Sequence, residues 1–386
     1  MPPKRPAAAG GGGTDGGKLG PVGALGGAHA APGGGVPALS PGPPVGGNGE
    51  LMHATLAAAV EGNGACSIHF WTMQTLCHGH SVHHVRITIS GSSGLIGSAL
   101  VQRLHDSGHQ VIRLVRGTPQ PTATPGSSIR WDPSADVLPN EAIEGVDAVI
   151  NLSGAGIGDH RWTPEYKTEL LQSRLRTTGL LARSIAAATA PPAVFLSGSA
   201  IGWYGDRGDE SLDETSAPGT GFLADVCVQW EAATDPAQSS PVRIVHLRTG
   251  IVLSGAGGAL KKQLPLFKFG LGGKFGTGRQ WQSWISIDDY VSALQFLLIE
   301  PLSGAVNLTA PHPVTNAAFT DVLGTVLHRP TVLPIPSFGP KLLLGAELAQ
   351  ALLYTGQRVM PERLVASGFT FAQPELEGAL RSLLGR

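Results

Sequence analysis

Short β-branched stretches alternate with longer amphipathic stretches from about Val85 onward. Apolar side chains recur on alternate residues, or in short runs, at 85–90, 110–115, 147–152, 193–197 and 243–248, a pattern typical of strands. Between them, residues 98–107 and 164–189 carry apolar residues at helical spacing. Strands that alternate with helices indicate right-handed βαβ units and a parallel sheet. The pattern therefore predicts an α/β fold.

The alternation weakens from about Ser254, which predicts a smaller second lobe. Residues 260–278 look like a Gly/Lys-rich connection, and helices are expected at 290–299, 342–353, 361–366 and 374–384. At the other end, the first 50 residues are mainly Gly, Pro and Ala and contain no Ile, Phe, Tyr or Trp to bury. We expect a disordered leader at 1–84, a nucleotide-binding domain at 85–310 and a C-terminal module at 311–386.

Composition narrows the class of protein. The chain has 386 residues, 42% of them hydrophobic and 14% charged, and a formal net charge of −1. A near-neutral chain gives no electrostatic reason to expect nucleic acid or a membrane as partner. Three cysteines do not make a disulfide framework, and the N-terminus lacks the pattern of a secretory signal. These features predict a cytoplasmic protein.

The clearest motif is a glycine-rich turn between the first strand and the first helix. Its sequence, Gly-Ser-Ser-Gly-Leu-Ile-Gly, follows the GxxGxxG pattern. Glycine allows the tight turn and close approach of a pyrophosphate, and the helix N-terminus supplies free N–H groups. The predicted cofactor-binding residues here are Gly91, Ser93, Gly94, Leu95, Ile96 and Gly97. The alternative is a structural strand–helix turn in an unrelated α/β protein.

Two further residues bear on which dinucleotide binds. Arg116 ends the second strand, where an NAD-preferring site usually carries an acid, and an arginine there accommodates the 2′-phosphate of NADP. The alternative for Arg116 is a surface arginine. Asp132 follows a short expected strand at 128–130; it could bind the adenine amino group or simply begin the Asp-Pro turn.

Several longer motifs resemble one branch of the extended short-chain dehydrogenases. They begin with Asn151-Leu152-Ser153-Gly154-Ala155-Gly156 and continue at 161–163, 173–178, 202–210, 221–231, 248–253, 283–289, 356–361 and 366–369. The chain is similar to the epimerase family proteins, an atypical class of short-chain dehydrogenase/reductase, over about 85–384. The resemblance implies a Rossmann-type doubly wound parallel sheet with a smaller C-terminal α/β substrate lobe. It also implies NADP as cofactor, with Leu152 and Gly154 near it, and a homodimer formed through the helix at 222–234. It implies no known substrate.

The usual catalytic dyad of these enzymes is absent. A Tyr-x-x-x-Lys pair places both side chains on one helix face, and the lysine lowers the tyrosine pKa for proton transfer. None of the four tyrosines has a lysine four residues on. Aligning Glu231 with the family's glutamate puts Leu223 at the tyrosine position and Cys227 at the lysine position. We interpret Cys227 as a buried structural residue rather than a reactive thiol.

The remaining candidates for chemistry are few. Ser199 stands where the family places a serine or threonine, and it could polarise a carbonyl or cap the turn. Tyr204 lies in a Tyr-Gly-Asp turn with either a catalytic or a structural role. Four acids could act as acid or base or be solvated loop residues, and three tryptophans could line a pocket or pack: Asp206, Asp209, Glu210, Glu214, Trp203, Trp281 and Trp284.

A metal site is not expected. Cys77, His78, His80, His83 and His84 cluster in the leader, but no Cys-x-x-Cys pair completes a tetrahedral set.

Two hypotheses follow. The first is an NADP-dependent oxidoreductase or epimerase-like enzyme that acts on an unknown small molecule with an unorthodox proton-transfer group. The second is a non-catalytic NADP(H)-dependent sensor or binding module, which the missing dyad favours.

Overall fold

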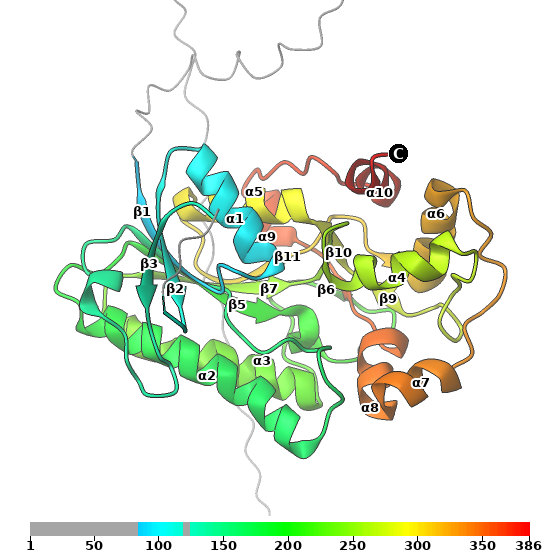
Figure 1. Cartoon of the computed structure of the whole chain (residues 1–386), viewed down its shortest axis with the longest axis horizontal. Coiled ribbons are helices and arrows are strands. Elements are labelled where there is room, and N and C mark those ends of the chain that lie inside the picture. Colours follow the sequence, from blue (N-terminus) through cyan, green and yellow to red (C-terminus); the bar gives the residue numbers. More distant parts are fainter. Residues whose placement is uncertain (1–83, 119–123) are drawn as a thin grey trace, which may run out of the picture. The chain divides into compact units, whose positions relative to one another are not determined.

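A seven-stranded parallel sheet forms the centre of the molecule (Figure 1). The computed structural model describes residues 84–118 and 124–386, all of which belong to one compact unit, Leu76–Arg386. The strand order is β11-β7-β5-β4-β1-β2-β3, and every neighbouring pair is parallel. The strands are β1 (Arg86–Ser90), β2 (Gln110–Val115), β3 (Ser127–Arg130), β4 (Ala148–Asn151), β5 (Val194–Ala200), β7 (Arg243–Thr249) and β11 (Gly304–Leu308). This order confirms the predicted Rossmann-type doubly wound sheet.

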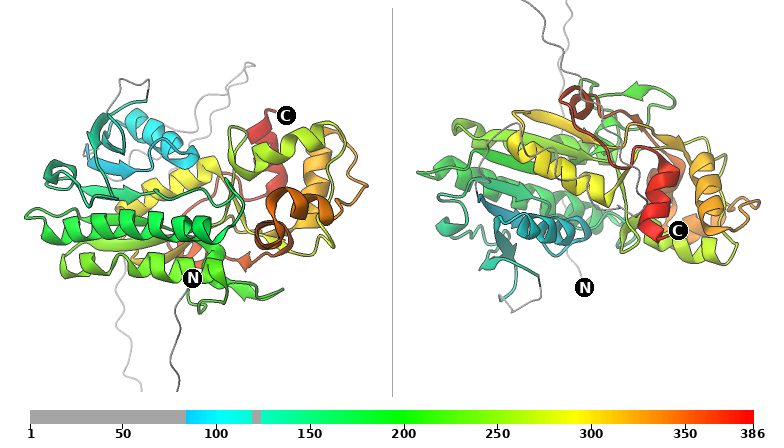
Figure 2. Two further views of the ribbon diagram at one scale, coloured as in Figure 1. Left: turned by 60° about the horizontal axis from the view of Figure 1, so that its bottom comes forward. Right: turned by 90° about the horizontal axis from the view of Figure 1, so that it is seen from above.

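Helices cover both faces of the sheet (Figures 1 and 2). Helices α1 (Leu95–Asp106) and α5 (Ile287–Ile299) lie on one face, and α2 (Pro164–Ala187) and α3 (Phe222–Ala232) lie on the other. Helix α1 begins at 95 rather than at the predicted 98, and α5 begins at 287 rather than at 290. The strands are apolar on both sides because both sides are covered.

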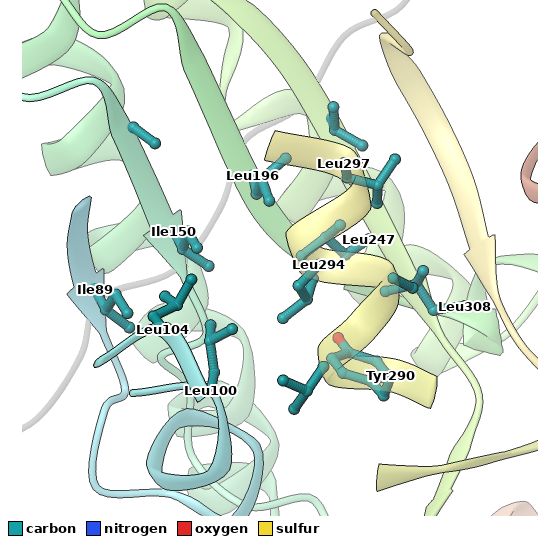
Figure 3. Close-up of a cluster of buried hydrophobic side chains, with 14 of the residues drawn as sticks. Ile89, Leu100, Leu104, Ile150, Leu196, Leu247, Tyr290, Leu294, Leu297 and Leu308 are labelled. Atoms are coloured by element: carbon teal, nitrogen blue, oxygen red, sulfur yellow. The ribbon is translucent and has the colours of Figure 1, made fainter. Parts of the chain in front are cut away.

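The alternation along the strands sorts side chains between two cores. Ile89 and Leu196 pack with α1 and α5, as Figure 3 shows, while the neighbouring Phe195 packs with α2. Tyr290 and Leu294 of α5 meet Leu100 of α1 in the first core. Two buried cores of this kind fix the sheet, and with it the loops at its carboxyl ends.

The second lobe has its own core. Helices α4 (Gly258–Lys268), α6 (Asn316–Leu327) and α10 (Leu376–Leu384) pack together through Leu264, Leu323 and Leu380. The expected connection at 260–278 is therefore wrong over α4. The other α-helices described are α7 (Phe338–Leu344), α8 (Ala346–Ala349) and α9 (Glu362–Ala366), and Leu364 of α9 packs in the first core of the sheet. The short strands form three pairs: β6 (Ser211–Leu212) with β13 (Arg358–Val359), β8 (Ile251–Leu253) with β10 (Trp284–Ser286), and β9 (Trp281–Gln282) with β12 (Val314–Thr315).

The predicted helix at 342–353 is broken. Gly345 has a φ of +91°, which ends α7 and starts α8, and a π-helical turn follows at Gln350–Tyr354.

The core of this lobe joins residues on both sides of position 310, because α4 precedes it and α6 follows it. The boundaries 85–310 and 311–386 stay predictions, and the leader 1–83 lies outside the described residues. Among the helices that are described, none is long and apolar enough to cross a membrane.

Candidate functional site

The glycine turn is built at the carboxyl end of β1. Gly91 has a φ of +72°, and a Cβ there would lie 2.6 Å from the carbonyl carbon of Leu152. A Cβ on Gly97 would lie 2.1 Å from the carbonyl oxygen of Gly91. The backbone N–H of Gly94 donates to that same oxygen at 3.0 Å. The three glycines thus allow the loop, the next strand and the start of α1 to lie in close contact.

The N-terminus of α1 is open to an anion. Within the described residues, no side chain caps this helix at Gly94, and its first turn contains no acid. The first N–H groups of a helix have no partner within the helix and carry partial positive charge. Leu95 and Ile96 lie in this first turn, and Ser93 lies in the loop directly before the N-cap. The turn therefore fits the pyrophosphate of a dinucleotide.

The end of β2 carries the predicted ribose-phosphate residue. Arg116 follows β2 directly and is exposed. Asp132 is half-buried, and its Oδ1 accepts from the backbone N–H groups of Ser134 at 2.9 Å and Ala135 at 3.2 Å. Those bonds fit the turn-forming role of Asp132. Its contact with an adenine stays a prediction.

The carboxyl end of β4 is held by a buried polar network. The side chain of Asn151 accepts from Ser90 Oγ at 2.6 Å and donates to Thr178 Oγ1 at 2.8 Å. Thr178 Oγ1 also accepts from the indole of Trp230 at 3.0 Å. This network joins β1, β4, α2 and α3. It fixes the start of the loop that contains Leu152 and Gly154.

A half-buried arginine, Arg174, lies against Gly154. A Cβ on Gly154 would lie 3.2 Å from Cζ of Arg174. Arg174 Nη1 donates to the carbonyl of Ala155 at 3.1 Å, and its guanidinium stacks 4.8 Å from the ring centre of Trp230. Burial lowers the pKa of Arg174. Arg174 belongs to the motif at 173–178, and no role for it could be predicted from the sequence.

The second lobe reaches across to the same loop. Lys262 of α4 donates to the carbonyl of Gly158 at 3.3 Å, and Arg161 donates to the carbonyl of Leu343 at 3.1 Å. Lys167 of α2 pairs with Glu347 of α8 at 2.6 Å. These bonds hold the lobe over the carboxyl edge of the sheet.

A shallow cavity of about 460 Å³ lies at the start of α2. None of the predicted cofactor-binding residues lines it.

The dyad positions hold residues that cannot exchange protons near neutral pH. Cys227 is buried, its Sγ lies 3.6 Å from the carbonyl oxygen of Ala200, and burial raises its pKa to about 12. The nearby charge of Glu231 also raises that pKa, while Arg174 acts in the opposite direction. Leu223 packs at Gly202. The contacts of Cys227 agree with its interpretation as a structural residue.

Ser199 belongs to a buried ion-pair cluster. Its hydroxyl donates to Oε1 of Glu231 at 2.6 Å. Arg248 donates to both oxygens of the same carboxylate, through Nε at 2.9 Å and Nη2 at 3.0 Å. All three side chains are almost fully buried. Because the single hydroxyl proton of Ser199 points to Glu231, these contacts favour a structural role, and polarisation of a carbonyl stays a prediction.

Tyr204 is part of the same cluster. Its hydroxyl donates to Oδ1 of Asn307 at 2.7 Å and accepts from Nη1 of Arg248 at 3.1 Å. The ring is fully buried, and burial raises the pKa of Tyr204 to about 12. Its contacts also favour the structural alternative. The hydrogen bond to Asn307 joins positions 103 apart in the sequence, so no local pattern could have revealed it.

The acidic group does not converge on one point. Asp206 accepts from the backbone of Gly208, Glu210 pairs with Arg207, and Asp209 accepts from the indole of Trp281 at 2.9 Å. Those three acids are exposed, whereas Glu214 is half-buried and its Oε1 accepts from the backbone N–H of Asn307 at 3.0 Å.

Glu214 has an unusual environment for a carboxylate. Burial raises its pKa. Its second oxygen, Oε2, is buried and has no hydrogen-bond partner among the residues described.

The tryptophans mainly pack. Trp203 lies 3.9 Å from the guanidinium of Arg248, and Trp284 is buried and donates to the carbonyl of His312. Trp281 is half-buried and stacks with Arg358 at 4.8 Å.

No group of three or more His, Cys, Asp or Glu side chains within 84–118 and 124–386 could hold a metal ion. Most of the histidine cluster at 77–84 lies outside the described residues.

Known proteins resemble this chain over nearly the whole of the described part. An epimerase family protein of Mycobacterium bovis is 46% identical over 295 residues, which cover 76% of this chain and 96% of that protein. A chloroplastic relative of SDR39U1 in Arabidopsis thaliana is 36% identical over 321 residues, covering 80% and 89%. The crystal structure of human epimerase family protein SDR39U1 with NADPH has a TM-score of 0.71 and 34% identity, covering 78% of this chain and 99% of that one.

Two family profiles match the chain. Residues 335–383 match a domain of unknown function, DUF1731, and residues 87–308 match the NAD dependent epimerase/dehydratase family. The second match contains the glycine turn, the β4 loop and the Ser199 cluster described above. From these matches and the order of the strands, the chain belongs to the NAD dependent epimerase/dehydratase family, among the epimerase family proteins.

Proposed function

We propose that this protein binds NADP(H) and is an oxidoreductase or epimerase-like enzyme of the short-chain dehydrogenase class, acting on a small molecule. The observation that carries the preference for NADP is the exposed Arg116 at the end of β2, at the position where an NAD-binding site usually has an acid. The NADPH bound to human SDR39U1 supports the same choice.

The residues fit the cofactor in the following way. Gly91, Gly94 and Gly97 would let the pyrophosphate approach the N-terminus of α1, and Arg116 would pair with the 2′-phosphate. Leu152 and Gly154 would lie along the cofactor at the end of β4. When bound, the nicotinamide supplies or accepts a hydride. Arg174, whose positive charge acts to lower the pKa of the Cys227 thiol, would supply half-buried positive charge near the position that aligns with the family's lysine.

The decisive experiment measures thermal stabilisation of the full chain by NADPH and by NADH. We expect a larger shift with NADPH in the wild type, since Arg116 recognises the extra phosphate. In Arg116→Glu the order should reverse. Arg176→Glu, at an exposed position on α2, is the matched control and should behave as the wild type. Equal shifts with both nucleotides, or none, would overturn the assignment of NADP.

A second candidate is a cofactor-dependent sensor without chemistry. Leu223 and the buried Cys227 in the dyad positions favour it, because neither exchanges a proton near neutral pH. Oxidation of NADPH by any member of a panel of carbonyl compounds would support the enzyme. A partner protein captured only in the presence of NADPH, without turnover, would support the sensor.

Two expectations complete the proposal. We predict a homodimer through the helix at 222–234, to be tested by sedimentation velocity. We also predict a cytoplasmic location, although the Arabidopsis relative is named as chloroplastic.

A further inference from the structure

Exposed apolar side chains gather on one part of the second lobe. Eight large hydrophobic residues there are between 45% and 84% exposed: Leu266, Phe269, Leu271, Val332, Leu333, Phe338, Leu342 and Leu343. We call these eight residues the apolar tip. They come from the end of α4, the loop after it, the segment that leads into α7, and α7 itself. Scattered single apolar residues on a surface are ordinary, but a cluster of this size marks an interaction site.

The two segments of the tip lie side by side. The backbone N–H of Ile335 donates to the carbonyl of Lys274 at 2.9 Å, and Arg329 Nε donates to the carbonyl of Lys268 at 2.9 Å. In Figures 1 and 2 the loop before α7 runs beside the loop after α4. None of the seven residues of α7 is buried. The two segments of the tip are therefore joined, and α7 exposes its apolar side chains although its C-terminal carbonyls are bound by Arg161.

The two chain segments that contain the tip carry side-chain charges of a single sign, and the exposed acids Asp321 and Glu347 flank the second segment. Residues 251–287 and 322–346 contain no Asp or Glu, and they carry seven cations: Lys261, Lys262, Lys268, Lys274, Arg279, Arg329 and Lys341. All seven are exposed. The net charge of the whole chain is −1, so the positive charge is concentrated here and balanced elsewhere. The expectation of no membrane partner relied on that net charge, which conceals this local excess.

We propose that the apolar tip docks on an anionic lipid surface. Exposed Phe and Leu side chains would enter the boundary between headgroups and acyl chains, and the surrounding lysines and arginines would contact acidic headgroups. A second copy of this chain is a poor occupant, because it would bring seven further positive charges to the same face. The contact is peripheral, and it does not depend on the cofactor proposal.

The test is flotation of the full chain with vesicles of phosphatidylcholine, with and without phosphatidylserine. We expect binding only when phosphatidylserine is present, and release by added salt. Each Lys→Gln change at Lys268 or Lys274 should weaken binding about fivefold, from about 1 kcal/mol per cation near the surface. Phe338→Ser with Leu342→Ser should abolish binding.

Matched controls lie away from the tip. Ile299→Ser, at an 87% exposed apolar position on α5, and Arg176→Gln on α2 should bind vesicles as the wild type does. Circular dichroism establishes that each variant is folded. Absence of binding by folded wild type, or equal loss in the controls, would overturn the proposal. So would a wild-type dimer that dissociates in the Phe338/Leu342 variant, because the tip would then be a contact between copies.

Discussion

At the scale of single residues, Glu231 is the centre of the buried polar cluster. It neutralises Arg248 through two hydrogen bonds and accepts a hydrogen bond from the Ser199 hydroxyl, and Arg248 in turn donates to Tyr204. Burial of this pair is acceptable because each charge has a partner of opposite sign and well-formed hydrogen bonds. This cluster therefore holds together β5, α3 and β7.

Removing Glu231 should be strongly destabilising. We expect Glu231→Ala to lower the free energy of unfolding by about 3–5 kcal/mol, because Arg248 would keep a buried charge without a partner. Urea denaturation measures the change. Glu210→Ala breaks a salt bridge in which Glu210 is half-exposed and should cost less than about 1 kcal/mol. Similar losses in the two variants would contradict the buried-pair interpretation.

The sequence allowed some of these residues to be identified but not their partners. The glycine turn and Arg116 could be located because their role depends on neighbours a few residues away. The bonds from Ser199 to Glu231 and from Tyr204 to Asn307 span 32 and 103 positions. Such pairs are fixed by the packing of whole strands and helices, which a single sequence does not specify residue by residue.

At the scale of elements, the strand–turn–helix unit β1–α1 carries the cofactor assignment. We expect Gly97→Ala to abolish stabilisation by NADPH and to destabilise the fold, because its Cβ would lie 2.1 Å from the Gly91 carbonyl oxygen and displace α1. Thermal shift with and without NADPH measures both effects. Gly94→Ala, with a contact of 3.3 Å, should be milder, and Gly117→Ala, with open space, should be neutral. Full NADPH binding by Gly97→Ala would argue against the role of this turn.

Prediction of the elements failed mainly in the second lobe. Helix α4 was expected to be part of a connection, because residues 260–278 are rich in Gly and Lys. A helical signal was nevertheless present: Leu260, Leu264 and Phe267 recur at helical spacing, and all three are buried. The sheet was easier to predict because its strands are buried on both faces and read as short apolar runs.

At the scale of the whole molecule, Asp289 fastens the C-terminal segment to the body. Its carboxylate, buried at the start of α5, accepts from the backbone N–H groups of Ala372 at 2.7 Å and Gln373 at 3.0 Å. These residues precede α10. One side chain thus ties the chain's last helix to the helix that covers the sheet.

Loss of this tie should loosen the C-terminal segment before the sheet. We expect Asp289→Ala to increase hydrogen exchange and protease cleavage at about 366–376, since two backbone donors lose a charged acceptor. Exchange in β1 and β4 should be little changed. Asp288→Ala, at the exposed neighbouring position, is the control. Uniform loss of protection across the sheet would show instead that the body and the segment unfold together.

The interleaving of the second lobe with the sheet also limits how parts of this protein can be exchanged between relatives. The lobe core takes α4 from before β11 and takes α6 and α10 from after it. A chimera with one crossover near position 310 would bring α6 and α10 from one parent against α4 from the other. Recombination that keeps this core intact needs two crossovers, and drift in α4 must be matched by change in α6 or α10. Among relatives, the sequence of this lobe would therefore diverge by coordinated substitutions in α4, α6 and α10 more readily than by exchange of the whole lobe.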